Sequence, residues 1–201
     1  MSRRRLGIPC TIIVFLACSA SADMPKAPRA ASAAAGASDI ALPAAAPAAP
    51  SPLGNWDVTE STDAMDGVTN VTLMLTSDDV LPLAFPHNDR YGRLVIRCKQ
   101  RKTDLYVVTE TPVQSNYGEF DESDIRYRFD DGKPLHATFS ESTDHSAIFA
   151  PSPVHLAKRL ATARTWLVEF TPYDAAPVTV SFSLEGLAKA LPKVGAACGW
   201  Q

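Results

Sequence analysis

The residues best suited to chemistry lie in one short stretch, Phe139 to Pro153, which reads FSESTDHSAIFAPSP. Ser140, Ser142, Asp144 and His145 supply the three side-chain types of a hydrolytic triad. A triad needs groups that meet from different elements, however, and neighbouring side chains of a strand alternate between its two faces. The stretch is therefore predicted to be a polar turn that closes a hairpin, with Ser142 and Asp144 as structural residues. The chain is not predicted to be an enzyme.

A serine hydrolase is the alternative interpretation of this stretch, in which Ser142 or Ser140 would act with a histidine from elsewhere. The remaining sequence contains no G-x-S-x-G, H-E-x-x-H or phosphate-binding loop. The four histidines are His87, His136, His145 and His155. None of them stands at metal-ligand spacing from another His or Cys. We therefore expect no metal and no cofactor.

The segment that precedes these elements has the layout of an export signal. A basic start, Arg3 to Arg5, is followed by the apolar run Ile8 to Ala17 and by the cleavage pattern Ala20-Ser21-Ala22. Residues 1–22 are therefore predicted to be a signal peptide, and the mature protein is predicted to be periplasmic. Cys18 allows a second interpretation as a lipidated cysteine, in which case the protein would be anchored to the membrane.

Composition divides the remaining chain into a tether and one domain. Residues 23–53 are rich in Ala and Pro and contain few large apolar side chains, which is typical of a disordered tether. Residues 54–201 are predicted to form a single β-rich domain with 14 Lys and Arg residues against 20 Asp and Glu residues. This acidic balance argues against nucleic acid as a partner. The one basic run, RCKQRK at residues 97–102, is expected to lie mostly along one face of a strand.

Alternation of apolar and polar residues predicts that the domain is built mainly from strands. The pattern is clear in VTLML, RLVIRC, DIRYRFD, TWLVEF and VTVSFSL. We expect a mainly β (α+β) fold, either an antiparallel β-sandwich or a rolled sheet, with about seven strands and two short helices. The first helix should begin at Pro153 with Ser152 as its cap, and the second should span residues 184–191 and stop at Pro192.

The cysteines and tryptophans of the domain are predicted to be structural. Cys98 and Cys198 are the two cysteines that remain after export, and they most simply form one disulfide. Trp56, Trp166 and Trp200 are expected to fill the core, with Trp200 packed over the disulfide; a binding role for Trp200 is the alternative. A further functional alternative is a small-ligand or glycan-binding module, in which Tyr117, Tyr173 or Trp166 would line an open groove.

The order of several segments resembles the type VI secretion-associated VasI/TagO family of exported proteins. The matching segments are WDVTESTDAMDGVTNVTLML, GRLVIRCKQRKTDLYV, FSESTDHSAIFAPSPVHLAKRL and VTVSFSLEGLAKALPKVGAACGW. The family pattern has two acidic residues where this chain has Asp66-Gly67. The resemblance implies a periplasmic accessory protein with no catalytic residues to carry over, and it implies structural roles for the paired cysteines and the STD turn. We therefore expect a non-enzymatic protein that binds an envelope or secretion-apparatus protein.

Overall fold

The computed structural model describes residues 52–83, 89–116 and 121–201. The predicted signal peptide, Cys18 and the tether up to residue 51 lie outside the described residues, as do His87 and Tyr117. The strands are β1 (Asp57–Thr62), β2 (Thr69–Val80), β3 (Tyr91–Lys99), β4 (Lys102–Val108), β5 (Glu122–Phe129), β6 (Leu135–Glu141), β7 (Ala147–Phe149), β8 (Thr165–Phe170) and β9 (Val178–Ser183). The helices are α1 (Pro153–Leu160) and α2 (Leu187–Cys198), and neither is long and apolar enough to span a membrane.

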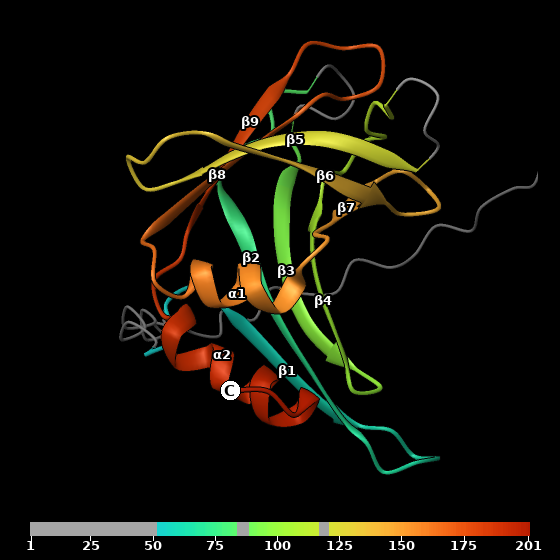
Figure 1. Ribbon diagram of the computed structural model, residues 1–201, viewed down its shortest axis with the longest axis vertical. Coiled ribbons are helices and arrows are strands. Elements are labelled where there is room, and N and C mark those ends of the chain that lie inside the picture. The colour runs from blue at the N-terminus through green and yellow to red at the C-terminus, as the bar shows by residue number, and fades with distance from the viewer. Residues whose placement is uncertain (1–51, 84–88, 117–120) are drawn as a thin grey trace, which may run out of the picture. The chain divides into compact units, whose positions relative to one another are not determined.

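All nine strands belong to one antiparallel sheet, in the order β1-β2-β3-β4-β7-β6-β5-β8-β9 (Figure 1). The predicted mainly β fold is confirmed, and its form is the rolled sheet. The roll brings β9 back toward β2 and β3, where Ser181 Oγ donates a hydrogen bond to Asp79 Oδ2 at 2.9 Å. A Cβ atom at Gly92 would lie 3.1 Å from Cγ2 of Val180, so a glycine in β3 lets β9 approach closely. β9 is not hydrogen-bonded to β2 or β3 through the backbone in the described sheet, which therefore stays open.

The strands form where apolar side chains alternate with polar ones, as predicted. The inward positions of five strands are buried: Val71, Leu73 and Leu75 of β2, Leu94, Ile96 and Cys98 of β3, Ile125 and Phe129 of β5, Trp166, Val168 and Phe170 of β8, and Val178, Val180 and Phe182 of β9. The predicted number of strands, about seven, is too low because β1 is mostly exposed and β7 has only three residues. Neither segment carries a strong alternation that a sequence pattern would reveal.

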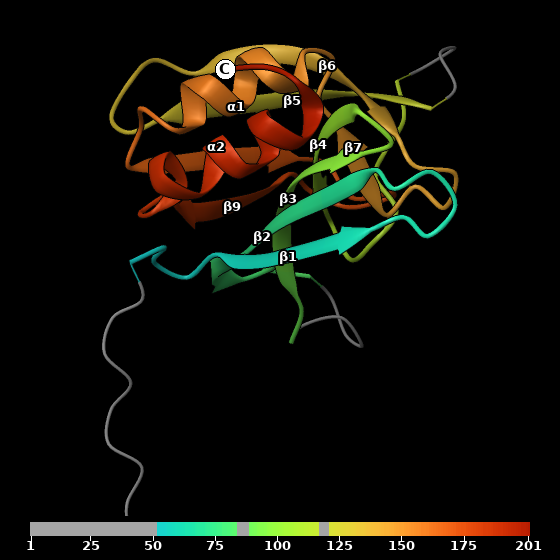
Figure 2. The same cartoon turned by 90° about the horizontal axis from the view of Figure 1, so that it is seen from below.

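Both helices lie on the same side of the rolled sheet (Figure 2). α1 begins at Pro153 as predicted, with Ser152 in the cap position, but the Ser152 side chain makes no capping hydrogen bond. α1 packs against β4, and α2 packs against β2 and β3. Leu156, Ala157 and Leu160 are the buried residues of α1.

The prediction for the second helix was wrong at both ends. α2 begins after Gly186 and continues through Pro192 as far as Cys198. Gly186 makes the start of the helix possible, because φ is 89° there and a Cβ atom would lie 2.2 Å from the carbonyl oxygen of Leu53. An internal proline costs roughly 3 kcal/mol. The cost is offset by tertiary packing, since α2 buries Leu187, Ala190, Leu191 and Val194 and ends in a disulfide.

The predicted disulfide joins Cys98 of β3 to Cys198 at the end of α2, across 100 residues of sequence. Cys98 is fully buried at the inward face of β3. The covalent bond therefore fixes the last turn of α2 to the end of β3. This position of α2 forms one wall of the groove described below.

The basic run at residues 97–102 is not one face of a strand. It contains the end of β3, a two-residue turn at Gln100-Arg101 and the start of β4. Both turn residues have left-handed backbones, with φ of 50° and 61°. Asn70 holds the turn by accepting a hydrogen bond from the Gln100 backbone N–H at 2.9 Å. Arg97 pairs with Asp104 at 3.0 Å, so part of the positive charge of the run is neutralised within the protein.

Candidate functional site

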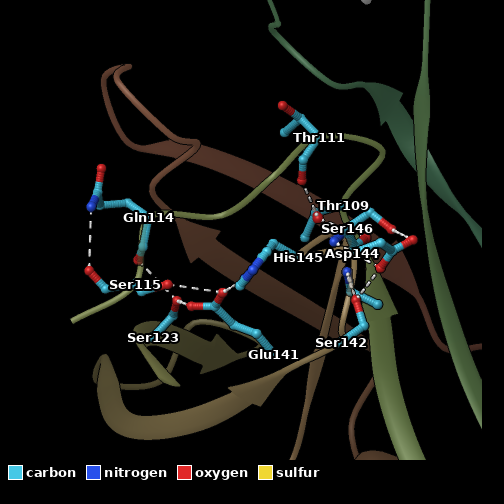
Figure 3. Close-up of polar contacts among 11 residues, drawn as sticks. Thr109, Thr111, Gln114, Ser115, Ser123, Glu141, Ser142, Asp144, His145 and Ser146 are labelled. Atoms are coloured by element: carbon cyan, nitrogen blue, oxygen red, sulfur yellow. Dashed lines mark hydrogen bonds and ion pairs between the residues drawn. The ribbon is translucent and has the colours of Figure 1, made fainter. Parts of the chain in front are cut away.

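The stretch with triad-type residues lies in the hairpin turn between β6 and β7 (Figure 3). Ser142 Oγ donates to Asp144 Oδ1 at 2.5 Å and accepts from the Ala147 backbone N–H at 3.0 Å. Ser146 Oγ donates to the other carboxylate oxygen of Asp144 at 2.8 Å. Hydrogen bonds from Ser142 and then Ser146 lower the pKa of Asp144 to about 2. Ser142 therefore supports the turn, and among the described residues no histidine side chain is hydrogen-bonded to its hydroxyl group.

His145 points away from this turn network and pairs with Glu141 (Figure 3). His145 Nδ1 lies 2.6 Å from Glu141 Oε2. Ser115 Oγ donates to the same oxygen at 3.0 Å, and Ser123 Oγ donates to Glu141 Oε1. The Glu141 side chain is 0% exposed, while that of His145 is 42% exposed. A fully buried carboxylate is thus satisfied by three partners from three different segments.

These contacts tie the chain that follows β4 to β5 and to the β6–β7 turn. Ser115 belongs to residues 109–116, Ser123 to β5 and His145 to the turn. Backbone hydrogen bonds reinforce the connection, since Val113 N–H donates to the His145 carbonyl oxygen at 2.9 Å. Thr109 N–H donates to the Ser146 carbonyl oxygen at 2.8 Å. The Glu141 cluster, defined as Ser115, Ser123, Glu141 and His145, therefore braces this end of the sheet.

The pairing also changes the electrostatics of His145. The hydrogen bond to Glu141 raises the pKa of His145 above its ordinary value of 6.5, with smaller contributions from the charges of Glu141, Asp121 and Asp144. His145 Nε2 has no hydrogen-bonded hydroxyl partner among the described residues. Within the same residues, no group of three His, Cys, Asp or Glu side chains is arranged to hold a metal ion.

Sequence reasoning missed Glu141, although a signal was present. Glu141 follows the buried Phe139 by two positions in β6, so both side chains point to the same inward face. An acidic residue at an inward position of a strand needs partners that share its burial. Its partners Ser115 and Ser123 are 26 and 18 residues away in sequence, so no local pattern identifies them.

Two of the three tryptophans are enclosed in the domain. Trp166 is fully buried, with its ring centroid 5.9 Å from that of Phe182. Trp56 is also buried, before β1. Tyr173 is 68% exposed in the turn between β8 and β9, and Tyr117 lies outside the described residues. Since Trp166 has no exposed surface, it cannot line the open groove that the glycan-binding alternative requires.

Trp200 is held between the two helices and the sheet. Its indole Nε1–H donates to Thr103 Oγ1 at 2.7 Å, and Thr103 stands opposite Cys98 in the β3–β4 register. Its backbone N–H donates to the Gly195 carbonyl oxygen at 2.9 Å. Lys158 Nζ lies 5.6 Å from the centroid of its ring. These contacts fix the indole beside the disulfide and leave part of its surface in an adjoining groove.

An open groove of about 640 Å³ lies between α1 and α2. Its lining comes from one residue of α1, from the outer side of α2 and from the segment after α2: Lys158, Ala188, Leu191, Pro192, Gly195, Ala196, Gly199, Trp200 and Gln201. Lys158 is the single ionisable side chain among these nine residues. Gly195 lets Trp200 fold back over the helix, because a Cβ atom there would lie 2.5 Å from the Trp200 carbonyl oxygen. The groove offers apolar contact surface and one ammonium group.

Comparisons with known proteins give a similarity of fold to solved structures. No family model matches the chain, and no curated protein matches it. Among solved structures, the crystal structure of invasion associated protein B from Bartonella henselae is similar, with 11% sequence identity and a TM-score of 0.48. The similarity covers 72% of this chain and 94% of that chain. A similarity at this level says nothing about the activity of this chain.

Proposed function

We propose that this protein is an exported, non-enzymatic protein of the bacterial envelope, and that it binds another protein through the groove between α1 and α2. The lining of the groove carries the proposal. It supplies apolar surface from Leu191, Pro192 and the Trp200 indole, and its one ionisable side chain is that of Lys158. Grooves of this size with mostly apolar walls and few polar groups are typical binding sites.

Location in the periplasm is supported by two independent features. The N-terminal sequence has the layout of an export signal. The Cys98–Cys198 disulfide requires an oxidising compartment, and the periplasm is one. The resemblance to the VasI/TagO family supports the more specific proposal that the partner is a component of a type VI secretion apparatus. Lipidation at Cys18 would place the same groove on a membrane-anchored protein.

The proposal is tested by blocking the groove. Ala188 is exposed and lines the groove, so Ala188→Trp should fill it without disturbing the core. The matched control is Ala176→Trp, because Ala176 is an exposed alanine in the β8–β9 turn that does not line the groove. Each affinity-tagged protein is incubated with a mild detergent extract of the envelope, and the co-purified proteins are quantified by mass spectrometry.

We expect the wild type and Ala176→Trp to retain the same specific partner. Ala188→Trp should recover at least about tenfold less of this partner, which corresponds to a loss of about 1.4 kcal/mol in binding free energy. Recovery of no specific protein by the wild type contradicts a protein-binding function. Equal recovery by both variants contradicts binding at the groove. A reproducible partner that belongs to no secretion apparatus contradicts only the type VI assignment.

A further inference from the structure

We infer that the groove between α1 and α2 receives an acidic protein segment, in which an apolar side chain enters the groove and flanking Asp or Glu side chains meet the lysines at its edges. This inference rests on the proposed function and specifies the chemistry of the partner. It is carried by the distribution of charge around the groove.

The two helices differ sharply in charge from the domain that carries them. α1 and α2 contain Lys158, Arg159, Lys189 and Lys193 and no Asp or Glu. The domain as a whole, residues 54–201, has 14 basic and 20 acidic residues. Outside the two helices, 10 basic residues therefore stand against 20 acidic ones. The helical side is a local positive region on an otherwise negative protein.

Part of this positive charge is not neutralised within the described residues. Lys193 Nζ pairs with Glu60 Oε1 at 2.8 Å. Lys158 donates to a main-chain oxygen of Gln201, the last residue of the sequence, and lies over the Trp200 ring. Arg159 lies over the Phe129 ring and donates to Thr162 Oγ1 at 3.3 Å. Lys189 has no ion pair or hydrogen bond from its side chain to any described residue, and it is exposed.

The lysines lie at the edges of the groove and the apolar residues lie within it. Lys158 lines the groove from α1. Lys189 and Lys193 each follow a groove residue of α2, Ala188 and Pro192, so they stand about 100° farther round the helix. A bound segment would therefore meet an ammonium group on either side of its apolar anchor. Because Trp200 is already fixed by Thr103 and Gly195, the groove needs no rearrangement of the indole.

The same charge distribution favours a short protein segment over an anionic membrane surface. Outside the two helices the domain has 10 basic residues against 20 acidic ones, and like charges oppose the approach of such a domain to an anionic lipid bilayer. A single segment meets only the positive helical region. Opposite charges at the rim of an interface accelerate association and select the partner.

The experiment uses the full chain with a photo-crosslinking amino acid in place of Ala188, and with the same amino acid in place of Ala176 as the control. Purified protein is irradiated in envelope extract, and the cross-linked peptides are sequenced by mass spectrometry. The charge is tested with Lys158→Glu and Lys189→Glu, singly and together. Lys133→Glu, in the exposed β5–β6 turn, is the matched charge reversal at a residue that does not line the groove. Lys189→Glu alone guards against misfolding, since Lys189 makes no contact that supports the fold.

We expect a peptide with net negative charge to be cross-linked at position 188 and not at position 176. The double charge reversal should lower the yield about tenfold, Lys189→Glu should lower it severalfold, and Lys133→Glu should leave it unchanged. Cross-linking of a neutral or basic peptide, or cross-linking yields that the charge reversals do not change, would overturn the inference of an acidic segment. The proposal of a protein-binding groove would still stand. A phospholipid adduct or a peptide from a second copy of this chain overturns both the inference and the proposed partner class. Absence of any adduct while Ala188→Trp still recovers the partner places binding elsewhere and overturns the inference.

Discussion

In the FSESTDHSAIF stretch, residues that are adjacent in sequence belong to two different side-chain hydrogen-bond networks. Asp144 accepts hydrogen bonds from Ser142 and Ser146, while His145 turns to the buried Glu141. His145 reaches Glu141 from a left-handed backbone with φ of 55°, a conformation that a non-glycine residue adopts only where surrounding contacts hold it. The carboxylate of Glu141 supplies such a contact. Residues with the types of a triad are thus divided between a turn and a brace.

At this scale we predict that the stability supplied by His145 depends on pH. The pKa of His145 is raised in the folded protein, so its stabilising pairing with Glu141 is complete below the ordinary value of 6.5 and is lost as pH rises through the higher folded value. His145→Gln should therefore lower the melting temperature more at about pH 5.5 than at about pH 9.

The matched control is His155→Gln, because His155 is an exposed histidine of α1 without an ion-pair partner in the described residues. Melting curves of the three proteins across this range measure the difference. A destabilisation by His145→Gln that is the same at every pH would show that His145 contributes by packing alone.

Individual elements depend on tertiary contacts wherever their local sequence is unfavourable. α2 contains Pro192 and starts at a glycine, yet it forms because its buried face packs against β2 and β3. The turn between β3 and β4 places Gln100 and Arg101 in left-handed conformations that glycine or asparagine would adopt more readily. Asn70, from β2, holds that turn from outside.

The β3–β4 turn therefore allows a stabilising substitution. A left-handed conformation costs an ordinary residue about 1–2 kcal/mol, and glycine avoids this cost. Glycine also has more conformational entropy in the unfolded chain, which offsets roughly 0.5–1 kcal/mol of the gain. Arg101→Gly should raise the free energy of unfolding by about 0.5–1 kcal/mol. Chemical denaturation measures the change, with Lys99→Gly in β3 as the control that should destabilise. A lower denaturation midpoint for Arg101→Gly would mean that the Arg101 side chain makes a larger contribution than its backbone strain.

At the scale of the whole domain, the disulfide joins the sheet to α2, the helix that supplies most of the groove lining. It links the end of β3 to the last turn of α2, and Trp200 lies directly beyond it. The rolled sheet leaves this side uncovered by strands, and the two helices occupy it (Figure 2). The binding groove is therefore a product of the same arrangement that covers the core.

Removal of the disulfide should destabilise the domain by about 2–5 kcal/mol, because the bond closes a long loop. We expect a reducing agent to lower the melting temperature of the wild type and to leave that of the double variant Cys98→Ser/Cys198→Ser unchanged. The two cysteines should also resist alkylation until they are reduced. An identical melting temperature for the oxidised and reduced wild type would show that the bond adds no stability.

Local patterns were sufficient to predict the five strands with clear alternation, the hairpin turn at Ser142 to Ser146 and the start of α1, because each depends on neighbouring residues. The cysteine pairing also followed from the sequence, since two cysteines in an exported chain leave one simple choice. Glu141, the length of α2 and the groove beside Trp200 could not be predicted in this way. Each depends on contacts between residues far apart in the chain, such as Thr103 with Trp200 across 97 positions. Burial and packing free energy from such contacts overrides local preference, and it is known only when the chain is folded.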